Sequence, residues 1–222
     1  PVCALRRSNP FAAAFGLMVM VGICDSAAMI PSDRSLGGTV IYLDNHATTP
    51  VDPRVLDAML PYLRERFGNP SSRSHRFGWE ADEAVERGRA QVARLLGADA
   101  REIVFTSGAS EANNLALKGV AARRRDRGNH IVASPVEHPS VRETVEHLVA
   151  KGFEVTWLPV DPEGRVRPAD VANAITPRTI LVTVMTANNE IGAVQPIREI
   201  ARLCAARGIP FHTDAAQAVG RI

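Results

Sequence analysis

The sequence predicts an α/β fold in which helices cover both faces of a mostly parallel sheet. From Thr39 onward, short apolar runs alternate with amphipathic stretches whose apolar residues recur at helical spacing. Strands that alternate with helices in this way imply right-handed crossover connections. The run from Thr179 to Met185 is almost continuously apolar, as expected for a strand covered on both faces. With 222 residues, of which 45% are hydrophobic and 23% charged, the chain is large enough for a sizeable core and too apolar for wholesale disorder.

The sequence of the first part of the domain predicts one short strand and two helices. Asp52 is the expected N-cap of the first helix and Pro53 its first residue, because proline is favoured where a backbone N–H has no helical partner. In the second helix, apolar residues recur at helical spacing until Gly97, a residue type that commonly ends helices. The predicted elements are a strand at 40–43, a helix from 53 to about 66, a loop at 68–72 and a helix from about 75 to 96.

The rest of the chain repeats a strand followed by a helix. Cys204 falls on the inward side of the last predicted helix with Ile197 and Ile200, so we expect it in the core. Strands are predicted at 102–105, 130–133, 153–158, 179–185 and just before Asp214. Helices are predicted to begin near Ser110 and after Pro139, and to span 168–175 and 196–207.

The first 38 residues do not follow this pattern. The chain begins with Pro1 rather than methionine, and two arginines precede an apolar stretch at 11–23, which is the outline of a signal peptide. That stretch is too short to span a bilayer comfortably. Three interpretations stay open, namely a working secretion signal, untranslated sequence before Met29, or a disordered extension. We expect an N-terminal extension and linker at 1–38 and a regular α/β domain at 39–222.

Charge and cysteine usage argue against several classes of protein. The net charge of +2 comes from nearly balanced acids and bases, which does not favour nucleic acid as a partner. The basic run at 123–127 most simply ends a helix in solvent, because cations are favoured at the negative end of the helix dipole. A phosphate or nucleic-acid patch is the alternative. The three cysteines have neither disulfide nor metal spacing, which favours a reducing compartment. We expect a cytoplasmic location and no membrane partner.

The turn after the predicted strand at 102–105 is a candidate phosphate site. Residues 107–111 read SGASE and lead into a helix, whose unpaired N–H groups and dipole attract anions. Ser110 could add a hydroxyl there, although it could instead only cap the helix. The segment is neither a P-loop nor a GxGxxG motif, so it does not indicate a nucleoside triphosphate or a dinucleotide.

Polar side chains also follow the later strands. His138 lies just before a helix and could stack on a planar ligand or move a proton, although a lone loop histidine is often solvated. Asn189 follows the longest strand and could donate to a ligand oxygen, although adjacent amides are also turn formers. Asp214 and Gln217 follow the last strand. Because the carboxyl ends of parallel strands meet at one edge of a sheet, these residues together predict a pocket.

Six motifs follow one another from about Val40 to the end of the chain, and together they are highly specific for one protein family. They lie at 42–50 (YLDNHATTP), 68–72 (GNPSS), 102–111 (EIVFTSGASE), 137–138 (EH), 188–192 (NNEIG) and 212–217 (HTDAAQ). Together they resemble the motif series of cysteine desulfurases of the NifS/IscS type, within the class-V aminotransferase group. The resemblance implies the fold-type I architecture of that group, a homodimer, and pyridoxal 5′-phosphate as cofactor. It also implies that residues 39–222 are the N-terminal part of the domain that binds this cofactor.

The resemblance also implies roles for the residues that would face the cofactor ring. Asp214 would hydrogen-bond the protonated pyridine nitrogen, so that the ring can accept electrons from a carbanion. His138 would stack on the face of the ring and help proton transfers. It is the one residue of this chain to which the resemblance gives a catalytic role.

The remaining candidates would hold the cofactor's oxygens and the substrate. Ala109 and Ser110 would bind the phosphate, and Ser110 keeps the hydroxyl of the threonine found in many relatives. Gln217 and Asn189 would bond the phenolic oxygen of the cofactor. Asn189 would also lie near the carboxylate of the substrate.

The resemblance implies a complete reaction, of which this chain carries only some groups. In that family L-cysteine loses its sulfur to a cysteine thiolate on a mobile loop, which leaves alanine and an enzyme persulfide for iron–sulfur cluster assembly or thiolation. A sulfur-acceptor protein is therefore an implied partner. The Schiff-base lysine, the catalytic cysteine loop and the carboxylate-binding arginine of the family are not found, and Lys118 and Lys151 both precede Asp214. We expect an N-terminal fragment that alone is inactive and aggregation-prone.

Three functions stay open at this point. The full-length parent could be a cysteine desulfurase, or another class-V enzyme such as a selenocysteine lyase. In the third reading, the short chain acts only as a binding or dimerising module without catalysis.

Overall fold

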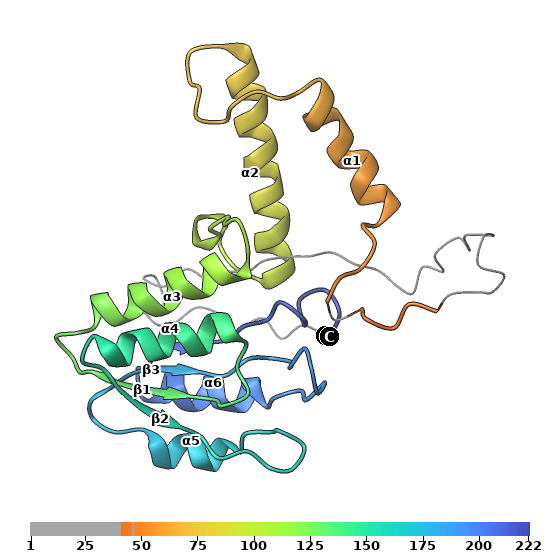
Figure 1. Ribbon diagram of the computed structural model, residues 1–222. Coiled ribbons are helices and arrows are strands. Elements are labelled where there is room, and N and C mark those ends of the chain that lie inside the picture. The colour runs from red at the N-terminus through yellow and green to blue at the C-terminus, as the bar shows by residue number, and fades with distance from the viewer. Residues whose placement is uncertain (1–40, 46) are drawn as a thin grey trace. The chain divides into compact units, whose positions relative to one another are not determined.

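The computed structural model describes residues 41–45 and 47–222 and divides the chain into two compact units (Figure 1). Of the described residues, 41–43 and 48–105 form the first unit, and the others form the second. The predictions for residues 1–38, including the signal-like stretch, lie outside the described residues, and so does Val40.

The first unit is helical. Helix α1 (Pro53–Arg64) is capped by Asp52, whose carboxylate accepts a 2.8 Å hydrogen bond from the Arg54 N–H. Helix α2 (Arg76–Leu96) ends at Gly97, which has a φ of 66°, a left-handed conformation that glycine adopts without steric cost. Both predictions are confirmed, although α1 ends two residues earlier than expected. Throughout the described part of the chain, no helix is long and apolar enough to cross a membrane.

Two strands predicted for the first unit do not form. Residues 41–43 have no regular structure, and their apolar side chains are exposed. The 3-10 helix η3 (Ala100–Glu102) occupies the start of the predicted strand at 102–105, and the rest of that segment is irregular. The Ile103 carbonyl accepts a hydrogen bond from the Arg89 guanidinium instead of a strand neighbour. These two predictions are wrong because β-prone residues form a strand only where another strand pairs with their backbone groups.

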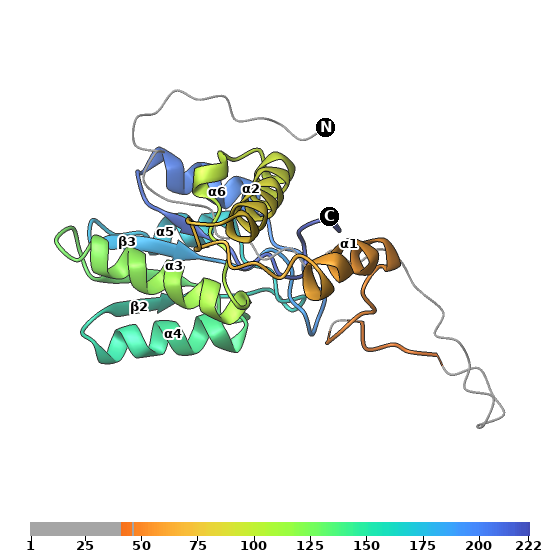
Figure 2. The ribbon, with the colours of Figure 1, turned by 90° about the horizontal axis from the view of Figure 1, so that it is seen from above.

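The second unit is a four-stranded parallel sheet with helices on both faces, which confirms the predicted fold class (Figures 1 and 2). Its strands are β1 (His130–Ala133), β2 (Glu154–Trp157), β3 (Thr179–Thr183) and β4 (Phe211–His212), and its helices are α3 (Ala109–Arg123), α4 (Pro139–Ala150), α5 (Pro168–Ala174) and α6 (Ile197–Ala206). The strands lie in the order β2-β1-β3-β4. Helices α3 and α4 cover one face and α5 and α6 the other.

Two hydrophobic clusters fill the two faces of this sheet. Successive side chains of a strand point to opposite faces, so Ile131 packs with α3 and α4 whereas Val132 packs with α5 and α6. All five residues of β3 are buried, as predicted for a strand covered on both faces. Cys204 of α6 is fully buried in the second cluster, and burial raises the pKa of its thiol to about 11. The prediction that Cys204 is a core residue is confirmed.

The basic run at 123–127 ends helix α3, as predicted. The Arg124 guanidinium donates to the Gly208 carbonyl at 3.1 Å, and the Arg125 guanidinium lies 5.0 Å from the centre of the Phe153 ring. Through these contacts the two arginines hold the loops that precede β4 and β2, near the amino end of the sheet.

Candidate functional site

The candidate site lies at the carboxyl end of the parallel sheet in the second unit. The segments that follow β1, β3 and β4 begin at this edge, because all four strands run in the same direction. In open α/β sheets this is the edge where ligands bind. The segments after β1 and β4 carry His138 and Asp214 to it.

Asp214 is a buried carboxylate in a fixed orientation. It is only 7% exposed. Its Oδ2 accepts a 2.8 Å hydrogen bond from the side-chain amide of Asn113, and its Oδ1 accepts a 3.0 Å bond from the Ala216 N–H. Its backbone carbonyl accepts from the Thr186 N–H at 2.8 Å. Because each carboxylate oxygen has two lone pairs, the group can still accept a hydrogen bond from a ligand.

His138 is joined to Asp214 through two other side chains. It is the N-cap of α4, and its Nδ1 accepts a 3.1 Å hydrogen bond from the Ser140 N–H. The Ser140 hydroxyl lies 2.8 Å from the same Nδ1 and accepts a 3.0 Å bond from Asn113. Within the described residues, Nε2 of His138 makes no hydrogen bond, and the ring is half-buried. The imidazole is thus held from one side, and its other nitrogen is available to a ligand.

Glu137 is a second buried acid at this edge. It is 6% exposed, and its Oε1 accepts a 2.7 Å hydrogen bond from the Met185 N–H just beyond β3. Its Oε2 is buried without a partner among the described residues. Burial is the main reason that the pKa of Glu137 rises to about 8; the charge of Asp214 raises it further, and the bond from Met185 opposes the rise. Glu137 therefore ties the segment before His138 to β3 and carries a proton at neutral pH.

His212 stays neutral beside these acids. Its Nδ1 lies 2.8 Å from the Thr183 hydroxyl of β3. Burial lowers the pKa of His212 to about 4, and this effect outweighs the charge of Asp214, which acts in the opposite direction.

The first turn of α3 has no side-chain cap. Gly108 is its N-cap residue, with an extended backbone and no capping hydrogen bond from a side chain. The alternative that Ser110 only caps this helix is therefore wrong; Ser110 is the second helical residue and is exposed, and Ala109 is half-buried. Glu111 instead accepts two 2.6 Å bonds from Ser107, which lower the pKa of its carboxyl group. The N–H groups at the start of α3 thus remain available to an anion.

The adjacent residues Asn188 and Asn189 have different roles, because the Asn188 side chain is used to fix the turn. The Asn188 side chain donates to the Val136 carbonyl at 2.8 Å and accepts from the N–H groups of Glu190 and Ile191. It therefore fixes the turn against the segment that leads to His138. Asn189 is half-buried beside it, and Gln217 is half-buried in the turn after β4. The predicted site residues thus lie in segments at one edge of the sheet. Among them, Asp214 and His138 are connected by hydrogen bonds that run through Asn113 and Ser140.

The sequence gives no role to three side chains that build the site, namely Asn113, Ser140 and Glu137. Asn113 is buried on the same helical stripe as Leu117 and Ala121. A polar residue at the spacing of an inward apolar stripe is a signal that sequence inspection could have used. Glu137 precedes α4 and Ser140 lies in its first turn, where the local sequence shows no such contrast.

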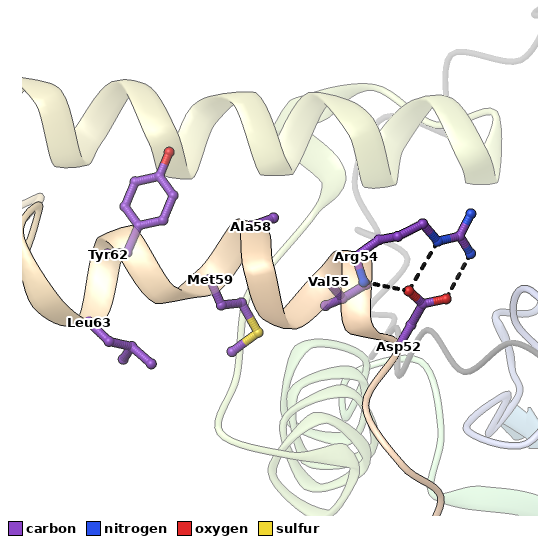
Figure 3. A pocket seen from close by; sticks show the side chains of 7 residues that line it. All are labelled: Asp52, Arg54, Val55, Ala58, Met59, Tyr62 and Leu63. Atoms are coloured by element: carbon purple, nitrogen blue, oxygen red, sulfur yellow. Dashed lines mark hydrogen bonds and ion pairs between the residues drawn. The ribbon is translucent and has the colours of Figure 1, made fainter. Parts of the chain in front are cut away.

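A separate hollow lies along helix α1 in the first unit (Figure 3). Its polar part is the ion pair between Asp52 and Arg54, whose hydrogen bonds lower the pKa of Asp52 to about 2. None of the residues predicted for the cofactor lines it. The lining residues are Asp52, Arg54, Val55, Ala58, Met59, Tyr62 and Leu63.

Comparison with known proteins gives consistent results. Residues 41–222 match the family described as aminotransferase class-V. The chain is 50% identical over 227 residues to the cysteine desulfurase of Homo sapiens, covering 100% of this chain and 50% of that protein. It is 55% identical over 182 residues to the cysteine desulfurase IscS of Rickettsia akari (strain Hartford), covering 82% and 44%.

Solved structures extend the similarity to the fold. A NifS-like protein matches with a TM-score of 0.77 at 41% identity, covering 80% of this chain and 49% of that chain. A structure described as SspA in complex with cysteine matches with a TM-score of 0.76 at 44% identity, covering 80% and 51%. This chain thus spans about half the length of the relatives it matches.

Proposed function

The chain belongs to the class-V aminotransferase family, and from this premise we propose that the full-length protein is a pyridoxal 5′-phosphate-dependent cysteine desulfurase. The similar proteins named cysteine desulfurase support this activity. A similar structure was described in complex with cysteine, which supports L-cysteine as the substrate. The proposed products are L-alanine and an enzyme persulfide.

The residues at the sheet edge fit this cofactor. A phosphate group suits the uncapped first turn of α3, where Ala109 and Ser110 supply backbone N–H groups and Ser110 adds its hydroxyl. A protonated ring nitrogen suits Asp214, because that carboxylate is buried, oriented and able to accept a further hydrogen bond. Asn189 and Gln217 are assigned to the phenolic oxygen of the cofactor.

Each residue of the site would then have a separate role in the reaction. Bound pyridoxal phosphate supplies an electron sink for the carbanion formed from an amino acid. Asp214 would keep a proton on the ring nitrogen. His138 would stack on the ring, and its Nε2 would hold or move a proton, because its Nδ1 is already engaged by Ser140. Asn189 would orient the substrate carboxylate.

The observation that carries this proposal is the buried, doubly hydrogen-bonded carboxylate of Asp214. Its test is to titrate the full-length protein with pyridoxal phosphate, follow the visible absorbance of the bound cofactor, and then assay alanine and sulfide release from L-cysteine. We expect a stoichiometric absorbance band and alanine release. Binding without alanine from cysteine, but with alanine from selenocysteine, would assign the protein to the selenocysteine lyase class instead.

The partners follow from the same proposal. We expect a homodimer, measurable by light scattering of the full-length protein. We also expect a sulfur-acceptor protein for cluster assembly or thiolation, which would receive labelled sulfur from L-cysteine, and we expect a cytoplasmic location.

A further inference from the structure

Asn113 is the side chain that connects Asp214 with the neighbourhood of His138. It lies on α3 and is only 4% exposed. Its amide nitrogen is 2.8 Å from Oδ2 of Asp214 and 3.0 Å from Oγ of Ser140. An amide NH₂ group carries two hydrogens, so it can donate to both oxygens at once. Its orientation is unambiguous, because the amide oxygen would repel the Asp214 carboxylate at this distance.

The donors in this network have a fixed direction. The Asn113 amide can only donate to Ser140 Oγ, and the Ser140 backbone N–H can only donate to Nδ1 of His138. This backbone donor favours an unprotonated Nδ1 but is weak at 3.1 Å. The Ser140 hydroxyl, which accepts from Asn113, turns its own hydrogen towards Nδ1 at 2.8 Å. The single ring proton of neutral His138 then resides on Nε2, the nitrogen that makes no hydrogen bond within the described residues.

We infer that Asn113 is a positioning residue that sets the orientation of the Asp214 carboxylate and, through the Ser140 hydroxyl, reinforces the Nε2–H tautomer of His138. This inference rests on the proposed cofactor site, since it gives Asn113 its importance through the two groups that would face the ring. The two branches can be separated. A change at Asn113 disturbs both, whereas a change at Ser140 disturbs only the branch to His138.

The Asp214 branch is tested by a double-mutant cycle on cofactor affinity in the full-length protein. Loss of a hydrogen bond to a charged group weakens an interaction by about tenfold or more, so Asn113→Leu should raise the dissociation constant of pyridoxal phosphate by about tenfold. In an Asp214→Ala background, the same substitution should change it by less than about threefold, because the acceptor is gone. An equal tenfold loss in both backgrounds would overturn this branch.

The next residue of the same helix offers a matched control. The Asn114 side chain donates at 2.9 Å to the Ser110 carbonyl within α3 and is not part of the network. Asn114→Leu should therefore change the dissociation constant by less than about threefold, since surface substitutions outside special features have small effects. A loss as large as that of Asn113→Leu would show that any polar residue on this helix matters equally, and would overturn the inference.

The His138 branch is tested without cofactor. Nitrogen-15 chemical shifts of the His138 ring, in cofactor-free full-length protein at neutral pH, report which nitrogen carries the proton. We expect the Nε2–H form in the unmodified protein and a larger fraction protonated at Nδ1 in both Asn113→Leu and Ser140→Ala. Ser140→Thr keeps the hydroxyl and should restore the original pattern. Unchanged shifts in Asn113→Leu and Ser140→Ala would overturn this branch.

These readouts separate failure of the inference from failure of the proposed function. If the unmodified protein binds no pyridoxal phosphate, the proposed function fails, whereas the chemical shifts still decide the His138 branch. If the protein binds the cofactor and releases alanine, but the variants behave like the unmodified protein in both experiments, only the inference fails. Thermal melting identifies a variant that does not fold, in which case Ser140→Ala and its threonine counterpart carry the test.

Discussion

Two histidines, His130 at the amino end of β1 and His138 in the segment beyond its carboxyl end, have different surroundings. His130, at the amino end, is 5% exposed and has both ring nitrogens near threonine hydroxyls, Thr179 at 2.8 Å and Thr156 at 2.9 Å. His138, in the segment beyond the carboxyl end, uses Nδ1 within the network of Ser140 and leaves Nε2 without a hydrogen bond among the described residues. The same side chain thus has a completed hydrogen-bond set at one end of the sheet and an open position at the other.

The difference extends beyond the histidines. At the carboxyl end, Glu137 Oε2 is buried without a partner and Asp214 can accept one more hydrogen bond. Buried polar groups normally have partners, so incomplete ones concentrate where a ligand belongs or where strain is held. At the amino end, burial lowers the pKa of His130, and its neutral ring matches the neutral hydroxyls around it. We therefore assign stability to the amino end and ligand chemistry to the carboxyl end.

The largest expected effect comes from the group that most defines the carboxyl end. Asp214→Asn in the full-length protein keeps the shape of the side chain but removes its charge, so it can no longer keep a proton on a cofactor ring. We expect alanine release to fall roughly 10²- to 10³-fold, the usual loss when one preorganised electrostatic group is removed. The measurement is steady-state release of alanine at saturating L-cysteine. A loss of alanine release below about threefold would mean that Asp214 does not take part in the reaction.

A pair of substitutions tests the comparison itself. His130→Ala removes a buried ring and leaves two hydroxyls without their partner, which should lower the free energy of unfolding by about 2–4 kcal/mol. It should leave the dissociation constant of pyridoxal phosphate nearly unchanged. His138→Ala should do the reverse, weakening cofactor binding and activity with a smaller loss of stability. Urea unfolding and cofactor titration measure both, and identical profiles for the two variants would abolish the distinction between the ends.

Glu137, at the carboxyl end, should make the stability of the protein depend on pH. Its pKa is about 8 in the folded protein, against an ordinary value of 4.5. The folded state therefore holds a proton that the unfolded state releases between these pH values, so stability falls as pH rises across this window. Glu137→Gln is neutral at every pH and should remove this slope. We expect the variant to be more stable than the unmodified protein by roughly 1–3 kcal/mol above pH 8.

The control for this prediction is the low end of the window. Near pH 4.5 the unmodified Glu137 is already protonated when folded, so the two proteins should differ much less there. Urea unfolding at pH 5 and pH 8.5 decides the matter. A constant difference at both pH values would mean that the substitution acts through packing rather than through the proton.

The comparison also explains what the sequence could predict. β1, β3 and α4 follow from apolar runs and from Pro139, because their burial and caps depend on local pattern. Asp214 and His138 could be placed at one edge because parallel strands share a direction. The helical spacing of Asn113 could indicate that it is buried, but not which groups it bonds. That bond joins residues 101 positions apart and, like the pairing of the two missing strands, it depends on tertiary contacts.

The smallest effect is expected at the exposed margin of the amino end. The Arg178 guanidinium makes two hydrogen bonds to the Glu154 carboxylate, at 2.6 and 2.7 Å, which lower the pKa of Glu154. Both side chains are more than half exposed, so water and salt screen the pair and Arg178→Ala should lower the free energy of unfolding only slightly. The loss should shrink further at 1 M salt, whereas that of His130→Ala should not. A large, salt-independent loss would mean that the amino end depends on its rim charges, and the buried histidine would then no longer explain its stability.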